Sequence, residues 1–140
     1  MRHFFAVVAF AFLAGCVQLP PSPEDLQAKR FEPAPDRAVV YLVRQPRDST
    51  EPGGLLMDTG EQITLLPGTY YRWEALPGMR RITGLGPWNV NFPLEVQAGR
   101  IYFLRYTVAG TPRMGPQFGT LTPVSEQEGR WLVQQAELVR

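Results

Sequence analysis

The sequence predicts a mainly β protein, either an antiparallel β-sandwich or a small barrel, with one short C-terminal helix. Short runs rich in β-branched and aromatic residues recur from residue 38 onwards, and turn residues such as Pro-Gly pairs separate them at close spacing. Only one convincing helical pattern follows, near the C-terminus. The chain has 140 residues and no internal repeat, so one domain is expected.

The first and the clearest expected strands frame this β-rich region. Residues 38–44 are almost continuously apolar, which predicts a buried strand. Residues 101–108 give the strongest strand pattern in the chain, and we expect this strand to be central. Arg44 and Arg105 are expected at strand ends or on the sheet surface, with their aliphatic stems over apolar neighbours.

The remaining strands are shorter or half-buried. Residues 69–76 alternate, with Tyr71, Trp73 and Ala75 on one face, as in a half-buried strand. Pro93 indicates an edge position or a bulge for the segment that contains it. Further strands are expected at 55–57 and 62–66, which form a hairpin, and at 79–83, 90–97 and 121–124.

The helical signal lies close to the end of the chain. Ser125-Glu126-Gln127-Glu128 has the spacing of a capping box, so a helix should follow it. Its apolar face is modest and includes Leu132, Ala136 and Val139. Gly129 weakens the first turn by up to about 1 kcal/mol.

The N-terminus carries a targeting signal. Arg2 precedes an apolar run from Phe4 to Leu13, which is too short to cross a bilayer but suits a signal-peptide core. The motif Leu13-Ala14-Gly15-Cys16 then resembles the lipobox of bacterial lipoproteins. This resemblance implies cleavage before Cys16, a diacylglycerol thioether on Cys16 and acylation of the freed amine. The alternative is an ordinary secretory signal that contains a cysteine.

The signal sets the expected domain organisation and location. We expect a signal peptide at 1–15, a lipidated N-terminus and proline-containing tether at 16–37, and the β-rich domain at 38–140. Five prolines favour an extended, semi-rigid tether, and a helical turn at Glu24–Arg30 is too short to be stable alone. In enterobacteria, an Asp directly after the lipidated cysteine resembles a signal for retention in the inner membrane. This chain has Val17 at that position, so the outer membrane is the expected location.

The composition of the mature chain excludes several kinds of chemistry. His3 is the only histidine and leaves with the signal, and Cys16 is the only cysteine and would carry lipid. Zinc sites, serine or cysteine triads and histidine acid–base catalysis are therefore unexpected. Lys29, the only lysine, lies in the expected tether. The mature charge is near neutral, so we expect no nucleic-acid partner. Because the mature chain lacks an imidazole and a free thiol, we also expect no metal, no cofactor and no enzymatic activity.

Two loops provide the candidate binding residues. One contains Trp88, with Arg80 and Arg81 near it, and the other contains Arg113, Met114 and Phe118. An exposed Trp beside Arg can stack on a sugar, a peptide side chain or a planar ligand. The alternative is that Trp88 covers the core beneath an ordered loop.

Acidic residues on the expected strands provide a weaker candidate site. A carboxylate pair drawn from Asp58, Glu74 and Glu95 would suit glycoside hydrolysis, which needs no histidine. Carboxylates on alternating strands more often mark a face that is exposed to water.

A second resemblance covers nearly all of the chain after residue 38. The turn and strand motifs resemble the bacterial domain-of-unknown-function family numbered 2846; they are Ala38–Arg44, Asp58-Thr59-Gly60, Leu65–Tyr70, Pro77-Gly78, Val96–Phe103 and Val124–Gly129. The resemblance implies small lipoproteins or secreted proteins with a β-rich domain, and it brings no established activity or catalytic residue. Met79 and Arg80 stand where the family often has a histidine.

Three functions remain as expectations. The first is an envelope lipoprotein that binds a protein partner without catalysing a reaction. The second is a structural component of an envelope or secretion assembly, and the third is a carboxylate-dependent cell-wall glycosidase. We expect the first, with the membrane as one partner through Cys16 and an envelope protein as the other.

Overall fold

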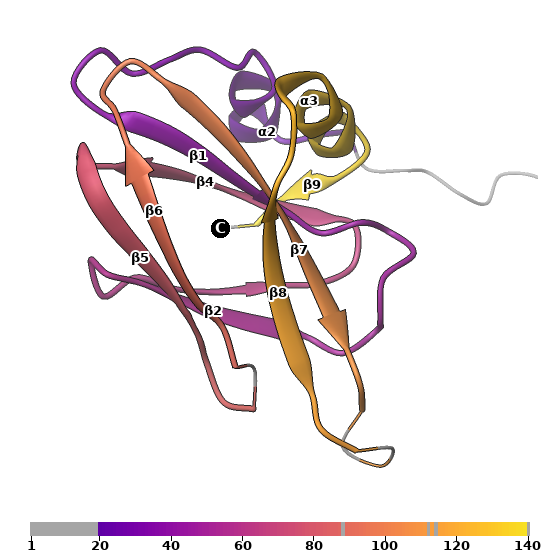
Figure 1. The fold of residues 1–140 in the computed structure, drawn as a ribbon. Helices are drawn as coiled ribbons and strands as arrows, with labels where there is room; N and C mark the ends of the chain where they lie inside the picture. Colours follow the sequence, from indigo (N-terminus) through magenta and orange to yellow (C-terminus); the bar gives the residue numbers. More distant parts are fainter. Residues whose placement is uncertain (1–19, 88, 112, 114, 140) are drawn as a thin grey trace, which may run out of the picture.

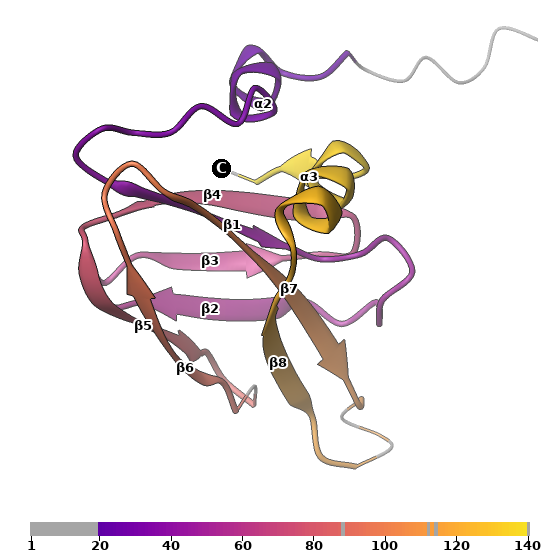
Figure 2. The ribbon, with the colours of Figure 1, turned by 45° about the horizontal axis from the view of Figure 1, so that its top comes forward.

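The protein consists of two β-sheets and a layer of helices. A computed structural model describes residues 20–139 except 88, 112 and 114. The first sheet, called sheet A, has the order β8 (Phe118–Pro123), β7 (Ile101–Ala109), β1 (Ala38–Val43), β4 (Thr69–Ala75) and β9 (Glu137–Leu138). The second, sheet B, has the order β3 (Gln62–Leu65), β2 (Gly53–Met57), β5 (Gly78–Gly84) and β6 (Asn91–Val96). Figures 1 and 2 show the two sheets packed face to face.

Strand β1 lies at the centre of sheet A, and its position explains its unbroken apolar sequence. It pairs antiparallel with β4 and parallel with β7. Val40 and Leu42 pack into the core between the sheets, whereas Val39 and Tyr41 pack on the opposite face beneath the helices. All six residues are buried because both faces of the strand are covered.

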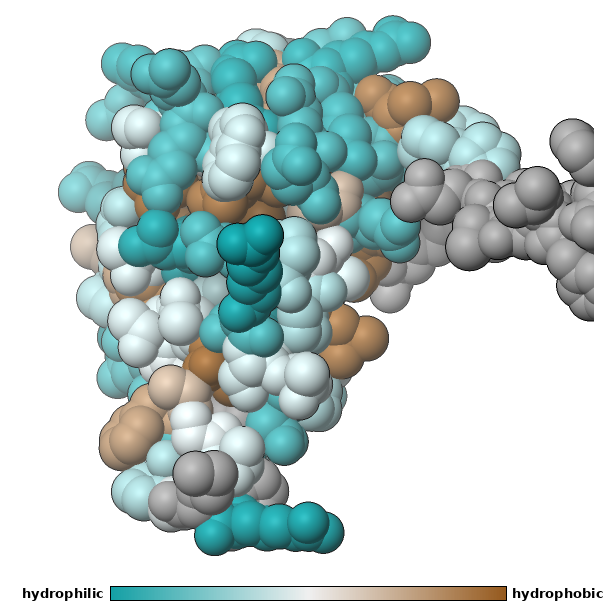
Figure 3. Space-filling model, turned by 90° about the vertical axis from the view of Figure 1, so that its right-hand side faces the viewer, coloured by the Kyte–Doolittle hydropathy of each residue, from teal (hydrophilic) through white to brown (hydrophobic). Residues whose placement is uncertain are grey.

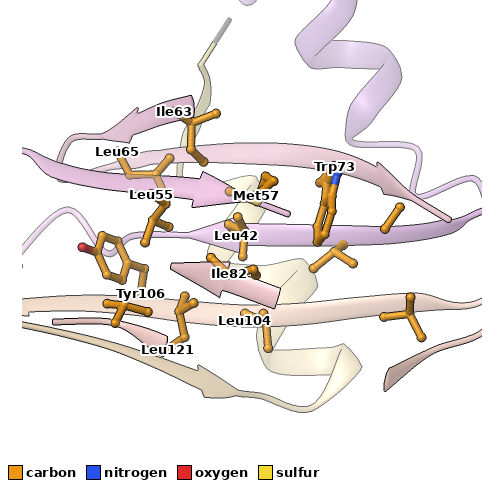
Figure 4. Close-up of a cluster of buried hydrophobic side chains, with 14 of the residues drawn as sticks. Leu42, Leu55, Met57, Ile63, Leu65, Trp73, Ile82, Leu104, Tyr106 and Leu121 are labelled. Carbon is orange, nitrogen blue, oxygen red and sulfur yellow. The ribbon is translucent and has the colours of Figure 1, made fainter. Parts of the chain in front are cut away.

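The main core fills the space between the sheets. Leu42 and Leu104 of sheet A meet Leu55 and Ile82 of sheet B, and Trp73 extends this cluster (Figure 4). Strand β6 is the edge strand that Pro93 predicted, and β7 lies inside sheet A as expected. Pairing of β6 with β5 continues through Pro93.

Two helices cover the outer face of sheet A. Helix α3 (Glu126–Gln134) contacts β7 and β1, and helix α2 (Pro23–Ala28) contacts β9, so both helices lie on the same side of sheet A (Figures 1 and 2). The predicted cap is present, because the Ser125 hydroxyl accepts a hydrogen bond from Glu128 N at 3.2 Å. Beneath the helices, Phe31, Tyr41 and Phe103 form an aromatic cluster with ring centroids 5.2–5.9 Å apart.

The mainly β class, the sandwich and the short C-terminal helix are confirmed. The chain forms two separate sheets rather than the barrel that the sequence left open. Sheet A also contains two parallel pairings, β1 with β7 and β4 with β9, so the sandwich is mixed rather than purely antiparallel.

Three local expectations need correction. Helix α3 ends at Gln134, and residues 137–138 pair with β4 instead of continuing the helix. Arg44 is completely buried rather than on the surface. The segment expected as a free tether is partly packed, because Asp25, Ala28 and Phe31 are buried against the domain. Within the described part of the chain, no helix is long and apolar enough to cross a membrane.

Candidate functional site

Asp25 fastens the N-terminal segment to the β-rich domain. Its Oδ1 accepts hydrogen bonds from the Tyr70 hydroxyl at 2.8 Å and from Leu138 N at 3.0 Å. Its Oδ2 lies 2.8 Å from Lys29 Nζ, and Lys29 Nζ also donates to Ala136 O at 2.7 Å. One carboxylate therefore joins α2 to β4 and β9, and we call these four residues, Asp25, Lys29, Tyr70 and Leu138, the latch.

The surroundings of the latch keep its tyrosine neutral. Burial, followed by the hydrogen bond to Asp25 and its negative charge, raises the pKa of Tyr70 far above its ordinary value. Tyr41 lies beside Tyr70, with ring centroids 6.1 Å apart, and donates to Ala28 O at 2.6 Å. Burial also raises the pKa of Tyr41. Both hydroxyls therefore remain donors that hold α2 in place.

An open groove lies beside the latch, between α2 and strand β4. Its volume is about 450 Å³. The residues that line it come from both ends of the described chain and from β4: Glu24, Gln27, Ala28, Glu32, Tyr71, Arg72, Glu74, Leu138 and Val139. Apolar and polar groups thus share the groove wall, as in sites that bind an extended segment of another protein.

The groove carries more negative than positive charge. Among the described residues, Arg72 is the only cationic one in the lining, and its guanidinium pairs with Glu74. Burial lowers the pKa of Arg72, but the hydrogen bonds with Glu74 and Tyr41 raise it above its ordinary value, so Arg72 keeps its positive charge. Glu24 and Glu32 add two more carboxylates, and Glu32 is largely exposed, with its Oε1 4.0 Å from Arg30 Nη1. The charge of the lining favours a cationic ligand segment over an anionic one.

Strand β4 presents free backbone groups next to this groove. Gly68 O and Tyr70 O accept hydrogen bonds from Glu137 N and Val139 N, so alternate residues of β4 face that edge. The pairing with β9 ends at Tyr70, whereas β4 continues to Ala75. By the same alternation, the backbone of Arg72 and Glu74 faces the edge, and no strand of the described chain pairs with it there. An added strand could therefore extend sheet A at this point.

The structure separates the residues that the sequence grouped around Trp88. Trp88 itself lies outside the described residues, as does Met114. Arg80 and Arg81 are consecutive in β5 and so point to opposite faces of sheet B. Arg80 Nε lies 3.6 Å from Asp58 Oδ2, and Arg81 donates to Asn91 Oδ1 at 2.8 Å. These arginines do not form one binding surface.

The second predicted loop forms the exposed tip of the β7–β8 hairpin. Arg113 is exposed, and Phe118 is 54% exposed at the start of β8. The turn between β5 and β6 lies at the same end of the molecule as this hairpin (Figure 1). A Cβ added at Gly119 would lie 2.7 Å from Val90 Cγ2, so the two hairpins are in contact. Their tips form a second candidate surface, remote from the groove.

The structure does not bring the three candidate glycosidase carboxylates together. Asp58 faces Arg80 and Glu74 faces Arg72, while Glu95 is exposed on edge strand β6. Asp58 lies in the turn after β2 and Glu95 in β6 of sheet B, whereas Glu74 belongs to β4 of sheet A. Among the described residues, no group of three or more His, Cys, Asp or Glu side chains is placed to hold a metal ion. Cys16 lies outside the described residues.

Sequence reasoning missed the latch and the groove. A signal for α2 was present, because Ser22 precedes Pro23 and acidic residues, and its hydroxyl accepts from Asp25 N at 3.1 Å. The partner residues Tyr70, Arg72 and Leu138 lie far away in the sequence, and no local pattern links them to α2.

The comparisons with known proteins add no relative. The chain matches no protein-family model, no curated protein and no solved structure. The function must therefore be argued from the geometry of the site.

Proposed function

We propose that this chain is a lipid-anchored protein of the bacterial envelope that binds a protein partner and catalyses no reaction. Cys16 carries the lipid, the outer membrane is the location, and the domain faces the periplasm. The lipobox motif supports the anchor, and the resemblance to the family numbered 2846 is retained as part of the proposal.

The observation that carries the binding function is the groove beside the free edge of β4. No strand in the described part of the chain pairs with the backbone of Arg72 and Glu74 there, and the groove supplies side-chain contacts next to them. An extended partner segment can add to such an edge by main-chain hydrogen bonds, while pockets for alternate side chains provide specificity. The excess of carboxylates selects a segment with basic side chains.

Crosslinking from intact membranes tests this proposal. The lipid-anchored protein would be crosslinked, solubilised and purified, and the captured proteins would be compared between wild type and Glu32→Arg, which reverses an exposed charge in the groove. The matched control is Glu95→Arg, the same charge reversal on exposed strand β6. We expect a specific partner with wild type and Glu95→Arg that is lost or strongly reduced with Glu32→Arg.

Other results of this experiment would reject parts of the proposal. If the partner were no longer captured with Phe118→Ser but were still captured with Glu32→Arg, the binding site would be at the hairpin tips and not in the groove. If no protein were enriched over a control lipoprotein, the binding function would be wrong. Membrane fractionation of Cys16→Ser tests the anchor separately, because release of the variant into the soluble fraction is expected only if Cys16 is lipidated.

A further inference from the structure

We propose that the outward face of helices α2 and α3 rests on the lipid surface, with Leu26 and Trp131 in contact with the bilayer. This inference rests on the proposed lipid anchor at Cys16. It adds an orientation, in which the helix layer faces the membrane and the hairpin tips of β5–β6 and β7–β8 point away from it (Figure 1).

The length of chain between the anchor and the fold requires the helix layer to be close to the membrane. An extended chain spans at most about 3.3–3.6 Å per residue, so Cys16 and Ser22, the N-cap of α2, are no more than about 20 Å apart. A domain of this size is roughly 35 Å across by the usual scaling of size with chain length. The anchor therefore cannot reach the far end of the domain while α2 stays in place.

The latch keeps α2 in place. Asp25 and Lys29 connect it to Tyr70, Leu138 and Ala136 by the contacts described above. Both the carboxylate and the amine would lose these partners if α2 detached, and Asp25 is only 4% exposed. The N-terminal segment therefore acts as part of the domain rather than as a free spacer.

Both helices present uncharged ridges on the side opposite to sheet A. Helix α3 buries Gly129, Leu132 and Val133, and at 3.6 residues per turn its opposite side carries Gln127, Trp131 and Gln134. Helix α2 buries Asp25 and Ala28, and its opposite side carries Pro23 and Leu26, while Gln27 lies toward the groove that it lines. Leu26 is 55% exposed and Trp131 is 58% exposed, which makes them the large apolar groups of this face.

The charged residues of α3 are neutralised beside these ridges. Glu126 pairs with Arg130 at 2.7 Å, and Glu128 pairs with Arg105 at 2.9 Å. A face without excess positive charge does not select anionic lipid. Trp and Leu instead suit the boundary between headgroups and acyl chains of a zwitterionic phospholipid surface.

This contact is weak by itself and depends on the anchor. Figure 3 shows the hydrophobic residues on one side of the molecule as small separate areas within a largely hydrophilic surface. Two half-exposed side chains bury little apolar area compared with an acyl chain, in which every buried methylene adds to the binding. The anchor raises the effective concentration of the bilayer at the helix face, so that a weak contact becomes persistent.

Fluorescence quenching by brominated lipids tests the orientation. The chain from residue 16 onwards would be coupled through the thiol of Cys16 to a maleimide lipid in phosphatidylcholine vesicles with or without brominated acyl chains. The emission of Trp131 is the part of the signal that Trp131→Phe removes. We expect brominated lipid to quench this emission and the vesicle surface to shift it to shorter wavelength.

A change of the attachment point provides the matched control. In a Cys16→Ser, Arg113→Cys variant, the same lipid is attached at the tip of the β7–β8 hairpin, and we expect Trp131 to be unquenched. Leu26→Ser should weaken the quenching when the anchor is at Cys16. The inference is wrong if brominated lipid leaves the Trp131 emission unchanged with the anchor at Cys16, or if high salt abolishes the quenching, which would indicate recognition by charge. The coupling here is chemical, so failure of the orientation is distinguishable from failure of the proposed lipidation, which fractionation of Cys16→Ser reports.

Discussion

At the scale of single residues, the interior contains one tyrosine whose buried hydroxyl makes no hydrogen bond. Tyr106 is completely buried, and its hydroxyl is the one buried side-chain polar atom without a hydrogen-bond partner in the described chain. Glycines flank the ring, because an added Cβ would lie 2.3 Å from Tyr106 Cε1 at Gly53 and 2.9 Å from the hydroxyl at Gly119. Burial raises the pKa of Tyr106 to about 12. The hydroxyl is therefore a destabilising group in the core.

We expect Tyr106→Phe to increase the free energy of unfolding by about 1 kcal/mol, since it removes a buried, unpartnered hydroxyl and keeps the ring. Urea denaturation followed by circular dichroism measures the change. The matched control is Tyr102→Phe, because the Tyr102 hydroxyl accepts from Gln97 N at 3.0 Å and its loss should reduce stability. A destabilised Tyr106→Phe variant would show that this hydroxyl has a partner in solution.

Arg44 shows at the same scale why a local sequence pattern misjudges a residue. Its guanidinium is completely buried; Nε pairs with Asp48 at 2.9 Å and Nη1 donates to Leu65 O at 2.8 Å. The carbonyls of Ser49 and Glu51 accept the remaining hydrogen bonds, and Asp48 also accepts from Val108 N at 3.0 Å. The sequence shows a charged residue at the end of a strand, but the acceptors come from a loop and from distant strands. Only the folded chain brings them together.

At the scale of elements, most of the strands could be predicted, but their partners could not. The unbroken apolar run in β1 is a local signal that predicted its complete burial. The alternation in β4 predicted buried Trp73 and Ala75, but Tyr70 on the opposite face is also buried, beneath the helix layer. The pairing of β4 with β9 is a contact over more than sixty residues, and the two-residue strand β9 has no pattern of its own. The groove depends on that pairing and on the latch, so it was not predictable from the sequence.

Gly129 in helix α3 is an element-scale case in which the structure reverses an expectation. Replacing Gly by Ala in the interior of a helix ordinarily increases the stability of the helix by up to about 1 kcal/mol. Here an added Cβ would lie 2.2 Å from Phe103 Cγ and 2.3 Å from Phe103 Cβ in β7. The glycine allows the helix to lie directly on sheet A, and a methyl group would separate the two elements.

We therefore expect Gly129→Ala to reduce the free energy of unfolding by about 1–3 kcal/mol, the usual range for overpacking. Thermal and urea denaturation measure it. Gln127→Ala, an exposed substitution in the same helix, serves as the control and should change stability by less than about 0.5 kcal/mol. If Gly129→Ala were more stable than wild type, helix propensity would outweigh the contact with Phe103.

At the scale of the whole molecule, the latch makes the β-rich domain and its N-terminal segment one unit whose stability depends on pH. The folded state raises the pKa of Tyr70, first by burial and then by the hydrogen bond to Asp25, so it favours the protonated phenol. The contribution of this protonated phenol to the free energy of unfolding is fully present below the pKa of a tyrosine in the unfolded chain, about 10. It is lost progressively as pH rises above that value.

We expect the melting temperature of the wild type to fall between about pH 9.5 and pH 11, with a loss of up to about 1.4 kcal/mol per pH unit from Tyr70. Tyr70→Phe removes this titrating group. It should be less stable than wild type at neutral pH but should lose less stability over the same alkaline range. Calorimetry of both proteins gives the comparison, and equal alkaline losses would show that Tyr70 is not responsible.

The place of β1 between β4 and β7 also determines when the chain can fold. Strand β1 begins at Ala38, but its parallel neighbour β7 ends only at Ala109, so sheet A has no complete centre until most of the chain is available. Contacts between residues so far apart in sequence make folding slow, because a long loop must close before they form. The emerging polypeptide therefore stays unfolded during synthesis. For a chain exported to the envelope, as proposed above, that is the state in which a secretion channel can accept it, and the domain would assemble after crossing the membrane.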